Sequence, residues 1–186
     1  MADKTFRMIR KIAITGPEST GKSILAEQLA AYYHTVWVPE FAREYLQILG
    51  KPYQEEDILV IAKGQIEAEA CKLKRADNYL FCDTELLVTK IWSEVKYQRC
   101  HPWITETMLV QQYDLYLLCN IDLPWQYDPL REHPDQRQFL FDLYYTELKN
   151  MQAPFAVVSG IGDVRMENAV EIINNFFENI GTIKDI

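Results

Sequence analysis

One eight-residue segment constrains this chain more than any other. Gly16-Pro17-Glu18-Ser19-Thr20-Gly21-Lys22-Ser23 follows the apolar run Ile9–Thr15 and precedes a segment with leucines at helical spacing. The pattern G-x-x-x-x-G-K-S between a strand and a helix is typical of a phosphate-binding loop. Its glycines allow a tight turn, and N–H groups of the loop and of the helix N-terminus can surround an anion. The chain must therefore bring a buried strand, this turn and a helix together.

We expect the segment to bind the phosphates of a nucleotide, ATP or GTP, with Mg²⁺, and we take ATP as the cofactor. Lys22 supplies a mobile cation that can follow charge on the β- and γ-phosphates and is a catalytic candidate, while the Ser23 hydroxyl is a candidate ligand of Mg²⁺. A structural glycine turn with an incidental lysine is the alternative. The loop residues expected to contact the nucleotide are Gly16, Glu18, Ser19, Thr20, Gly21, Lys22 and Ser23.

Short apolar runs alternate with longer segments of helical periodicity along the chain. This alternation is typical of a parallel sheet covered by helices on both faces. We predict an α/β fold with three layers, like that of P-loop nucleoside kinases, with a five-stranded parallel sheet in one domain over residues 1–186. The expected strands are Ile9–Thr15, Thr35–Pro39, Tyr79–Cys82, Leu115–Ile121 and Phe155–Ser159. The apolar positions that mark helices are Leu25 and Leu29, Ile58 and Ala62, Leu87, Ile91 and Val95, and Ala169, Ile173, Phe176 and Ile180.

The charge balance argues against polyanionic partners. Lys and Arg number 19 and Asp and Glu number 27, so the formal net charge is −8. Nucleic acids and anionic membranes require clustered cations, so we expect neither as a partner. Four cysteines lack a C-x-x-C spacing, and no leader-like or membrane-length apolar run is present, which predicts a cytoplasmic protein with reduced thiols.

Two carboxylates follow the expected second and third strands. Asp83 comes directly after Tyr79–Cys82, and Glu40 comes directly after Thr35–Pro39. Ligands of open α/β sheets bind at the carboxyl ends of the strands, so both side chains are expected to face the phosphate-binding loop. Asp83 is a candidate Mg²⁺ or substrate ligand, with a plain helix cap as the alternative. Either Glu40 or Asp83 can orient and deprotonate a substrate hydroxyl.

Residues 122–137 contain three prolines and mixed charges, which predicts a stiff loop that closes as a lid. Arg131, as a catalytic residue, and Arg137, as a nucleotide contact, are expected to reach the phosphates. Surface ion pairs with Asp128, Asp135 or Glu132 are the alternative for these arginines.

Further candidates lie on the expected helices. Gln65 and Glu69 interrupt the apolar stripe of the segment from Glu55 to about Ala76. Buried polar groups need partners, so Gln65 is expected to contact either a polar substrate or the backbone of another helix. Arg43 is expected to contact substrate or to form an ion pair on its own helix. Phe41 and Trp92 are candidates for stacking on a flat ring.

The segments GPESTGKS, VPEFAREYL, LFCDTELL and DPLREHPDQR together resemble the kinase domain of NadR-type proteins, which are ribosylnicotinamide kinases. The resemblance extends from about Ile12 to Ala169. It implies that Glu40, Arg43 and Asp83 line a riboside pocket, that Arg131 contacts phosphate, and that Lys22 and Ser23 serve ATP and Mg²⁺. The implied reaction converts ATP and nicotinamide riboside into ADP and nicotinamide mononucleotide.

Pro39 stands where some NadR kinase domains place a tryptophan, so the ring that stacks on nicotinamide would either be missing or come from elsewhere, with Phe41 and Trp92 as candidates. Two alternatives remain open on the sequence. One is a P-loop kinase for another nucleoside or small alcohol, and the other is a non-catalytic nucleotide-binding regulatory module. In each case the expected partner is a small molecule, and the sequence sets no oligomeric state.

Overall fold

The computed structural model describes residues 8–183, with side chains described up to residue 178. Five parallel strands form one sheet in the order β2-β3-β1-β4-β5. The strands are β1 (Arg10–Thr15), β2 (Val36–Val38), β3 (Tyr79–Asp83), β4 (Leu115–Cys119) and β5 (Phe155–Val158). The helices are α1 (Lys22–Tyr32), α2 (Phe41–Leu49), α3 (Glu55–Leu73), α4 (Leu86–Tyr97), α5 (Pro102–Val110), α6 (Arg137–Asn150) and α7 (Asp163–Ile183).

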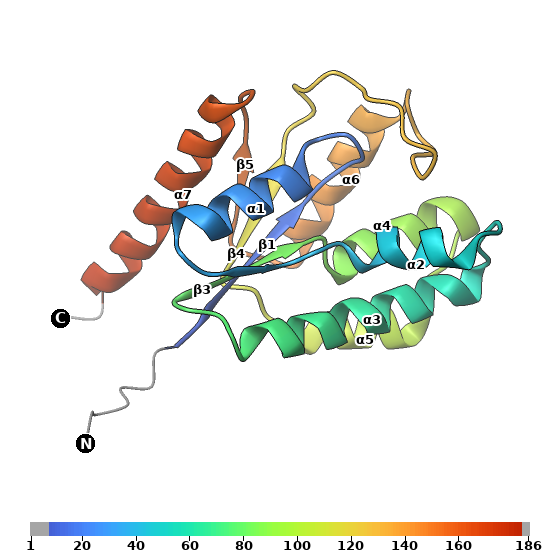
Figure 1. Cartoon of the computed structure of the whole chain (residues 1–186), viewed down its shortest axis with the longest axis horizontal. Helices are drawn as coiled ribbons and strands as arrows, with labels where there is room; N and C mark the ends of the chain where they lie inside the picture. Colours follow the sequence, from blue (N-terminus) through green and yellow to red (C-terminus); the bar gives the residue numbers. More distant parts are fainter. Residues whose placement is uncertain (1–7, 184–186) are drawn as a thin grey trace.

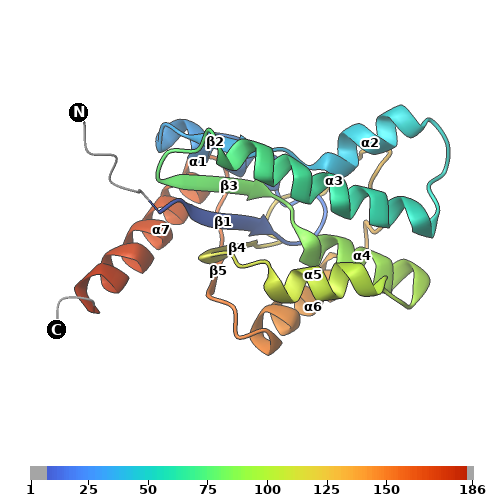
Figure 2. The same cartoon turned by 90° about the horizontal axis from the view of Figure 1, so that it is seen from below.

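The helices cover both faces of the sheet, so the molecule has three layers (Figure 1). Alternate residues of each strand enter two separate cores. Ile12 and Ile14 of β1 pack with α1 and α7, whereas Ala13 packs with residues of α3, α4, α5 and α6. Seen from below, α3 and α5 run along the face opposite to α7 (Figure 2). Strands buried on both faces explain the continuous apolar runs of the sequence, and the predicted fold class is confirmed.

The register of β1 decides which residues meet at its carboxyl end. β1 lies between β3 and β4, and Ile14 pairs with Asp83 while Thr15 pairs with Leu118. Asp83 is therefore the last residue of the strand beside the one that enters the glycine turn. The first helix begins at Lys22, immediately after that turn.

The element boundaries differ from the sequence predictions by one or two residues. The strand predicted over Thr35–Pro39 is the three-residue β2, and the one predicted over Leu115–Ile121 ends at Cys119. Helix α5 was not predicted. Ile180 lies outside the residues whose side chains are described. No helix of the described part is both long and apolar enough to span a bilayer.

Candidate active site

The glycine turn between β1 and α1 has the backbone that its sequence demands. Gly16 has φ +126°, and a Cβ there would lie 3.0 Å from the carbonyl oxygen of Cys119. Gly21 has φ +76°, in the left-handed region, directly before α1. The Thr20 hydroxyl donates to the Pro17 carbonyl at 2.8 Å, which holds the turn closed. Residues with a side chain at the two glycine positions would be strained, so the turn depends on both glycines.

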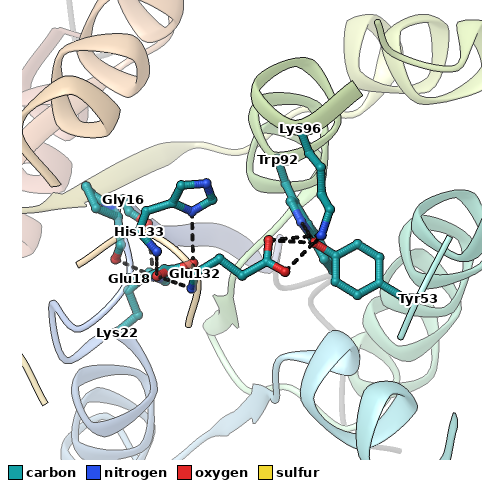
Figure 3. A network of polar contacts seen from close by, with 9 residues as sticks. Gly16, Glu18, Lys22, Tyr53, Trp92, Lys96, Glu132 and His133 are labelled. Atoms are coloured by element: carbon teal, nitrogen blue, oxygen red, sulfur yellow. Dashed lines mark hydrogen bonds and ion pairs between the residues drawn. The ribbon is translucent and has the colours of Figure 1, made fainter. Parts of the chain in front are cut away.

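Lys22 lies folded over this turn. Its ammonium donates to the carbonyl oxygens of Gly16 at 2.9 Å and Pro17 at 2.7 Å (Figure 3). Both acceptors are neutral, so phosphate oxygens would bind the ammonium more strongly than these carbonyls do. The Lys22 ammonium thus lies beside the glycine turn, where it could exchange these carbonyl oxygens for those of a bound phosphate.

Asp83 is buried and its carboxylate is poorly satisfied. Its side chain is 1% exposed, and neither oxygen has a hydrogen-bond partner of good geometry among the described residues. Burial, with the nearby charge of Glu40, raises the pKa of Asp83 to about 6, while Ser23, Lys22 and Arg43 act to lower that pKa. A buried carboxylate without partners requires a compensating cation or proton.

The surroundings of Asp83 fit Mg²⁺. Ser23 provides a hydroxyl close enough to lower the pKa of the carboxylate, and hard oxygen ligands are those Mg²⁺ prefers. The described residues contain no cluster of three His, Cys, Asp or Glu side chains that could hold a metal by themselves. Mg²⁺ usually keeps several waters and binds through one or two protein ligands together with substrate phosphates. The site therefore has the sparse ligand set expected for a nucleotide-bound metal.

Glu40 precedes the first residue of α2 and lines the cavity in front of the glycine turn. Arg43, one turn later, has its Nε 3.9 Å from a Glu40 oxygen and its Nη1 2.9 Å from a carboxylate oxygen of Asp128. The ion pair within the helix is therefore loose, and the shorter contact leads to the lid. Arg43 joins the start of α2 to the segment that covers the site.

Gln65 and Phe41 lie outside the wall of the cavity. The side-chain oxygen of Gln65 accepts the backbone N–H of Phe41 at 2.9 Å, and its amide nitrogen lies 3.4 Å from the carbonyl oxygens of Asp83 and Thr84. Of the two expectations for Gln65, the structure thus shows the backbone contact. The Phe41 ring packs instead against Gly64 of α3. Gln65 holds the start of α2 against the end of β3, which fixes Glu40 relative to Asp83.

The predicted lid extends between β4 and α6 and covers the glycine turn. Arg137 donates to the carbonyl oxygens of Leu123 at 2.8 Å and Ser19 at 3.4 Å. Arg131 contacts the Ser19 hydroxyl at 3.3 Å and the Gln126 carbonyl. Within residues 8–178, no ion pair joins either arginine to the three carboxylates considered above for surface pairing. Both guanidinium groups therefore point from the lid toward the glycine turn.

Glu18 of the glycine turn also contacts the lid. Its carboxylate accepts the backbone N–H of Glu132 at 3.1 Å and of His133 at 3.2 Å (Figure 3). The ring nitrogen Nδ1 of His133 lies 3.5 Å from the same carboxylate. The lid is therefore closed over the turn.

Two buried groups that were not among the predicted site residues support the site. Arg165 of α7 is 4% exposed, donates to the Thr20 carbonyl at 2.8 Å and forms an ion pair with Asp122. Glu85 caps α4 by accepting the N–H of Leu87, and it accepts the Thr15 hydroxyl at 2.9 Å. Burial raises the pKa of Glu85 to about 7, against the effect of these hydrogen bonds. Neither group carried a local signal, because each acts on a segment distant in the sequence.

These elements enclose one cavity of about 380 Å³. One end is lined by the glycine turn, the other by apolar side chains of α2 and α4, and the lid forms the roof. Among the predicted residues, Glu40, Arg43, Trp92 and Arg131 line the cavity together with the turn, whereas the buried Asp83 and the lid residue Arg137 are not part of the lining. The apolar residues that α2 and α4 contribute to the lining are Ala42, Leu46, Val88, Ile91, Trp92 and Val95, and α6 adds Leu140 and Tyr144.

Residues 11–165 match the AAA_28 family model, described as an AAA domain. The trifunctional NAD biosynthesis/regulator proteins NadR of Salmonella typhimurium and Escherichia coli K12 are each 32% identical to this chain over 127 residues. That region is 66% of this chain but 31% of each relative, so the chain spans only part of their length.

Solved structures share the fold. NadR protein in complex with NR superposes with a TM-score of 0.79 over 90% of this chain and 51% of that chain, at 18% identity. NadR in complex with NAD and AMP-PNP gives 0.76 over 90% of this chain and 49% of that chain, also at 18% identity. Deoxyadenosine kinase from M. mycoides with bound dATP gives 0.59, over 89% of this chain and 99% of that chain at 17% identity. The chain belongs to the AAA_28 family, has the fold of P-loop nucleoside kinases, and is a homologue of the NadR proteins.

Proposed function

We propose that this chain is a kinase that transfers the γ-phosphoryl group of ATP to the 5′-hydroxyl of nicotinamide riboside. The observation that carries the proposal is a cavity whose phosphate-binding end faces Glu40 and whose far end is apolar and includes Trp92. A nucleoside with a flat ring and a hydroxyl fits such a cavity, because its ring needs apolar contact and its hydroxyl needs a carboxylate near the phosphate. The similarity to NadR, which was solved with NR and with AMP-PNP, supports the same substrates.

The residues of the glycine turn and the lid would hold the nucleotide. Backbone N–H groups of the turn surround the β-phosphate, and Lys22 leaves the Gly16 and Pro17 carbonyls for the β- and γ-phosphates. Arg131 and Arg137 approach the turn from the lid and neutralise charge on the transferred group. When bound, Mg²⁺ supplies neutralisation of phosphate charge, and Ser23 and Asp83 are the residues that would hold it.

The acceptor hydroxyl must lose its proton as its oxygen bonds to the γ-phosphorus and the bond to the ADP oxygen breaks. Glu40 lines the cavity, whereas Asp83 is buried outside the lining and close to Ser23, and this arrangement favours Glu40 as the proton acceptor. We therefore assign proton acceptance to Glu40 and metal binding to Asp83. Arg43, held by Asp128, lies beside Glu40 and would contact the ribose.

The test is production of ADP and of phosphorylated nucleoside by the purified chain with Mg²⁺ and ATP. Nicotinamide riboside is compared with adenosine, cytidine, thymidine and no acceptor. Strong stimulation by nicotinamide riboside with stoichiometric nicotinamide mononucleotide supports the proposal. Stimulation by another nucleoside alone refutes the substrate but not the kinase, and ADP release indifferent to every acceptor refutes both. Glu40→Gln and Asp83→Asn, compared with Glu44→Gln on an exposed position of the same helix, separate the two carboxylate roles.

A further inference from the structure

We propose that Glu132 is a positioning residue that latches the lid across the acceptor end of the cavity, so that the phosphoryl group passes to the nucleoside and not to water. The inference rests on the proposed kinase function. It concerns three residues, Tyr53, Lys96 and Glu132, that lie in three separate segments of the chain and that nothing in the sequence brought together.

The side chain of Glu132 is held on the α4 side of the cavity (Figure 3). One carboxylate oxygen lies 2.8 Å from the Lys96 ammonium, and the other accepts the Tyr53 hydroxyl at 2.8 Å. Tyr53 in turn accepts the indole N–H of Trp92 at 2.8 Å, and the Lys96 ammonium lies 3.9 Å from the centre of the Tyr53 ring. The Lys96 ammonium also donates to the Tyr53 hydroxyl, at 2.5 Å. This hydroxyl therefore donates once and accepts twice, so its hydrogen-bonding capacity is fully used.

The backbone of the same residue contacts the opposite end of the cavity. The N–H of Glu132 donates to Glu18 of the glycine turn at 3.1 Å. Glu132 therefore joins the phosphate-binding turn to α4 through a single residue, with its main chain on one end and its side chain on the other. Arg131, the preceding residue, contacts the Ser19 hydroxyl, so the turn end of the lid has a contact that does not depend on the Glu132 side chain.

The protonation states suit this latch at neutral pH. Although partial burial acts to raise it, the pKa of Glu132 lies below its ordinary value because Lys96 and Tyr53 donate hydrogen bonds to the carboxylate and the charge of Lys96 acts in the same direction. Burial raises the pKa of Tyr53, and its hydrogen bond to Glu132 raises it further, so Tyr53 remains a donor. The carboxylate is thus charged and bound by one cation and one neutral donor.

The latch contributes more to lid position than to folding. The side chains of Lys96 and Glu132 are 32% and 36% exposed, and ion pairs at such exposure stabilise a fold only weakly. Even a weak interaction is sufficient to shift a lid between closed and open arrangements that are close in free energy. Loss of the latch should therefore leave the protein folded and leave the cavity open at the acceptor end.

An open acceptor end changes which oxygen attacks. In transfer, the nucleoside oxygen bonds to the γ-phosphorus, the bond to the ADP oxygen breaks, and the hydroxyl proton goes to Glu40. In hydrolysis, water replaces the nucleoside, and the products are ADP and inorganic phosphate. A lid that is anchored only at the turn still covers the nucleotide but admits water, so ADP formation exceeds nucleoside phosphorylation.

The experiment measures ADP and phosphorylated nucleoside in the same reaction for Glu132→Gln, Lys96→Met and the double variant. We expect the ratio of ADP to phosphorylated nucleoside to rise ~3-fold or more and the KM for the nucleoside to rise ~3-fold, with the KM for ATP changed less than ~2-fold. The double variant should be no worse than either single variant, because both remove one interaction. Asp135→Asn, an exposed lid carboxylate, is the matched control and should behave as the wild type.

A second readout needs no acceptor. Lys96→Met leaves the lid sequence unchanged, so trypsin cleavage after Arg131 and Arg137 reports lid opening directly. We expect faster cleavage than in the wild type and in Lys74→Met, which replaces an exposed lysine at the end of α3. Unchanged cleavage, or a fall in kcat with an unchanged product ratio, overturns the latch. If no nucleoside is phosphorylated by the wild type, the proposed function fails, while the cleavage rates still decide the latch.

Discussion

Replacing Asp83 by asparagine is expected to stabilise the nucleotide-free protein while it disables Mg²⁺-dependent turnover. The carboxylate is buried without a hydrogen-bond partner of good geometry among the described residues, and burial raises its pKa from 3.8 to about 6. The folded protein therefore holds this proton more tightly than the unfolded chain does. The stability of the wild type falls as the pH rises from about 4 to about 6, and an asparagine removes that loss.

The magnitude follows from the shift in pKa. A rise from 3.8 to about 6 is about 2 units, and at 1.36 kcal/mol for each unit it corresponds to about 3 kcal/mol at pH 8. About half of this, roughly 1.4 kcal/mol, develops between pH 5 and pH 8, where the unfolded chain is ionised and the folded Asp83 loses its proton. The buried amide of the asparagine has its own desolvation cost, but that cost does not depend on pH.

Urea unfolding of both proteins in EDTA, at pH 5, 6.5 and 8, measures the difference in free energy of unfolding. The advantage of Asp83→Asn should grow with pH and level off above about pH 7. Adding Mg²⁺ and AMP-PNP should reverse the order, because a bound cation stabilises only the protein that keeps the carboxylate.

A difference between the two proteins that is constant across this pH range would refute the reasoning, since it would mean that Asp83 has the same pKa in the folded and unfolded states. The pKa of Glu85 is also raised, to about 7, but Glu85 is present in both proteins, so its contribution to the difference in free energy of unfolding cancels.

Lys22→Met should lower kcat about 10²- to 10³-fold in the ADP-release assay, because it removes a charge that follows the transferred phosphoryl group, and a loss below tenfold would contradict that role. Glu40→Gln should lower turnover and also lower the pKa of Asp83, since the Glu40 charge helps to raise it. The pH at which Mg²⁺-nucleotide binding is half maximal reports this, and an upward shift would be inconsistent. Gly64→Ala should reduce the free energy of unfolding by about 1–3 kcal/mol, because the new Cβ would lie 2.2 Å from the Phe41 ring; wild-type stability in urea would show that α2 can move away from α3.

Much of the fold was accessible to sequence reasoning because its signals are local. β1, the glycine turn and α1 are contiguous, so spacing alone identified them. The central strands were recognised because both of their faces are buried and their residues are apolar throughout. Helix α5 was not predicted, because Pro102–Val110 is short and rich in residues that favour strands. Packing of Ile104 and Met108 into the core stabilises this segment as a helix.

The candidate site was partly predictable for a similar reason. The carboxyl ends of parallel strands meet at one edge of the sheet, which is why the sequence alone predicted that Glu40 and Asp83 lie near the glycine turn. The choice between alternatives was not predictable. Whether Gln65 contacts a substrate or a backbone depends on how closely α2 approaches β3, and that distance is set by packing.

The sequence by itself was sufficient to predict phosphate binding, because a phosphate-binding turn needs only a few residues in one short segment. Only the tertiary structure decided which groups surround that turn. Tyr53, Lys96 and Glu132 lie 36 to 79 residues apart, and their contact depends on helix packing and on the path of the lid. Local sequence signals act over a few residues, whereas burial and electrostatics act through space, so the part of the site that crosses between segments becomes visible only in the folded protein.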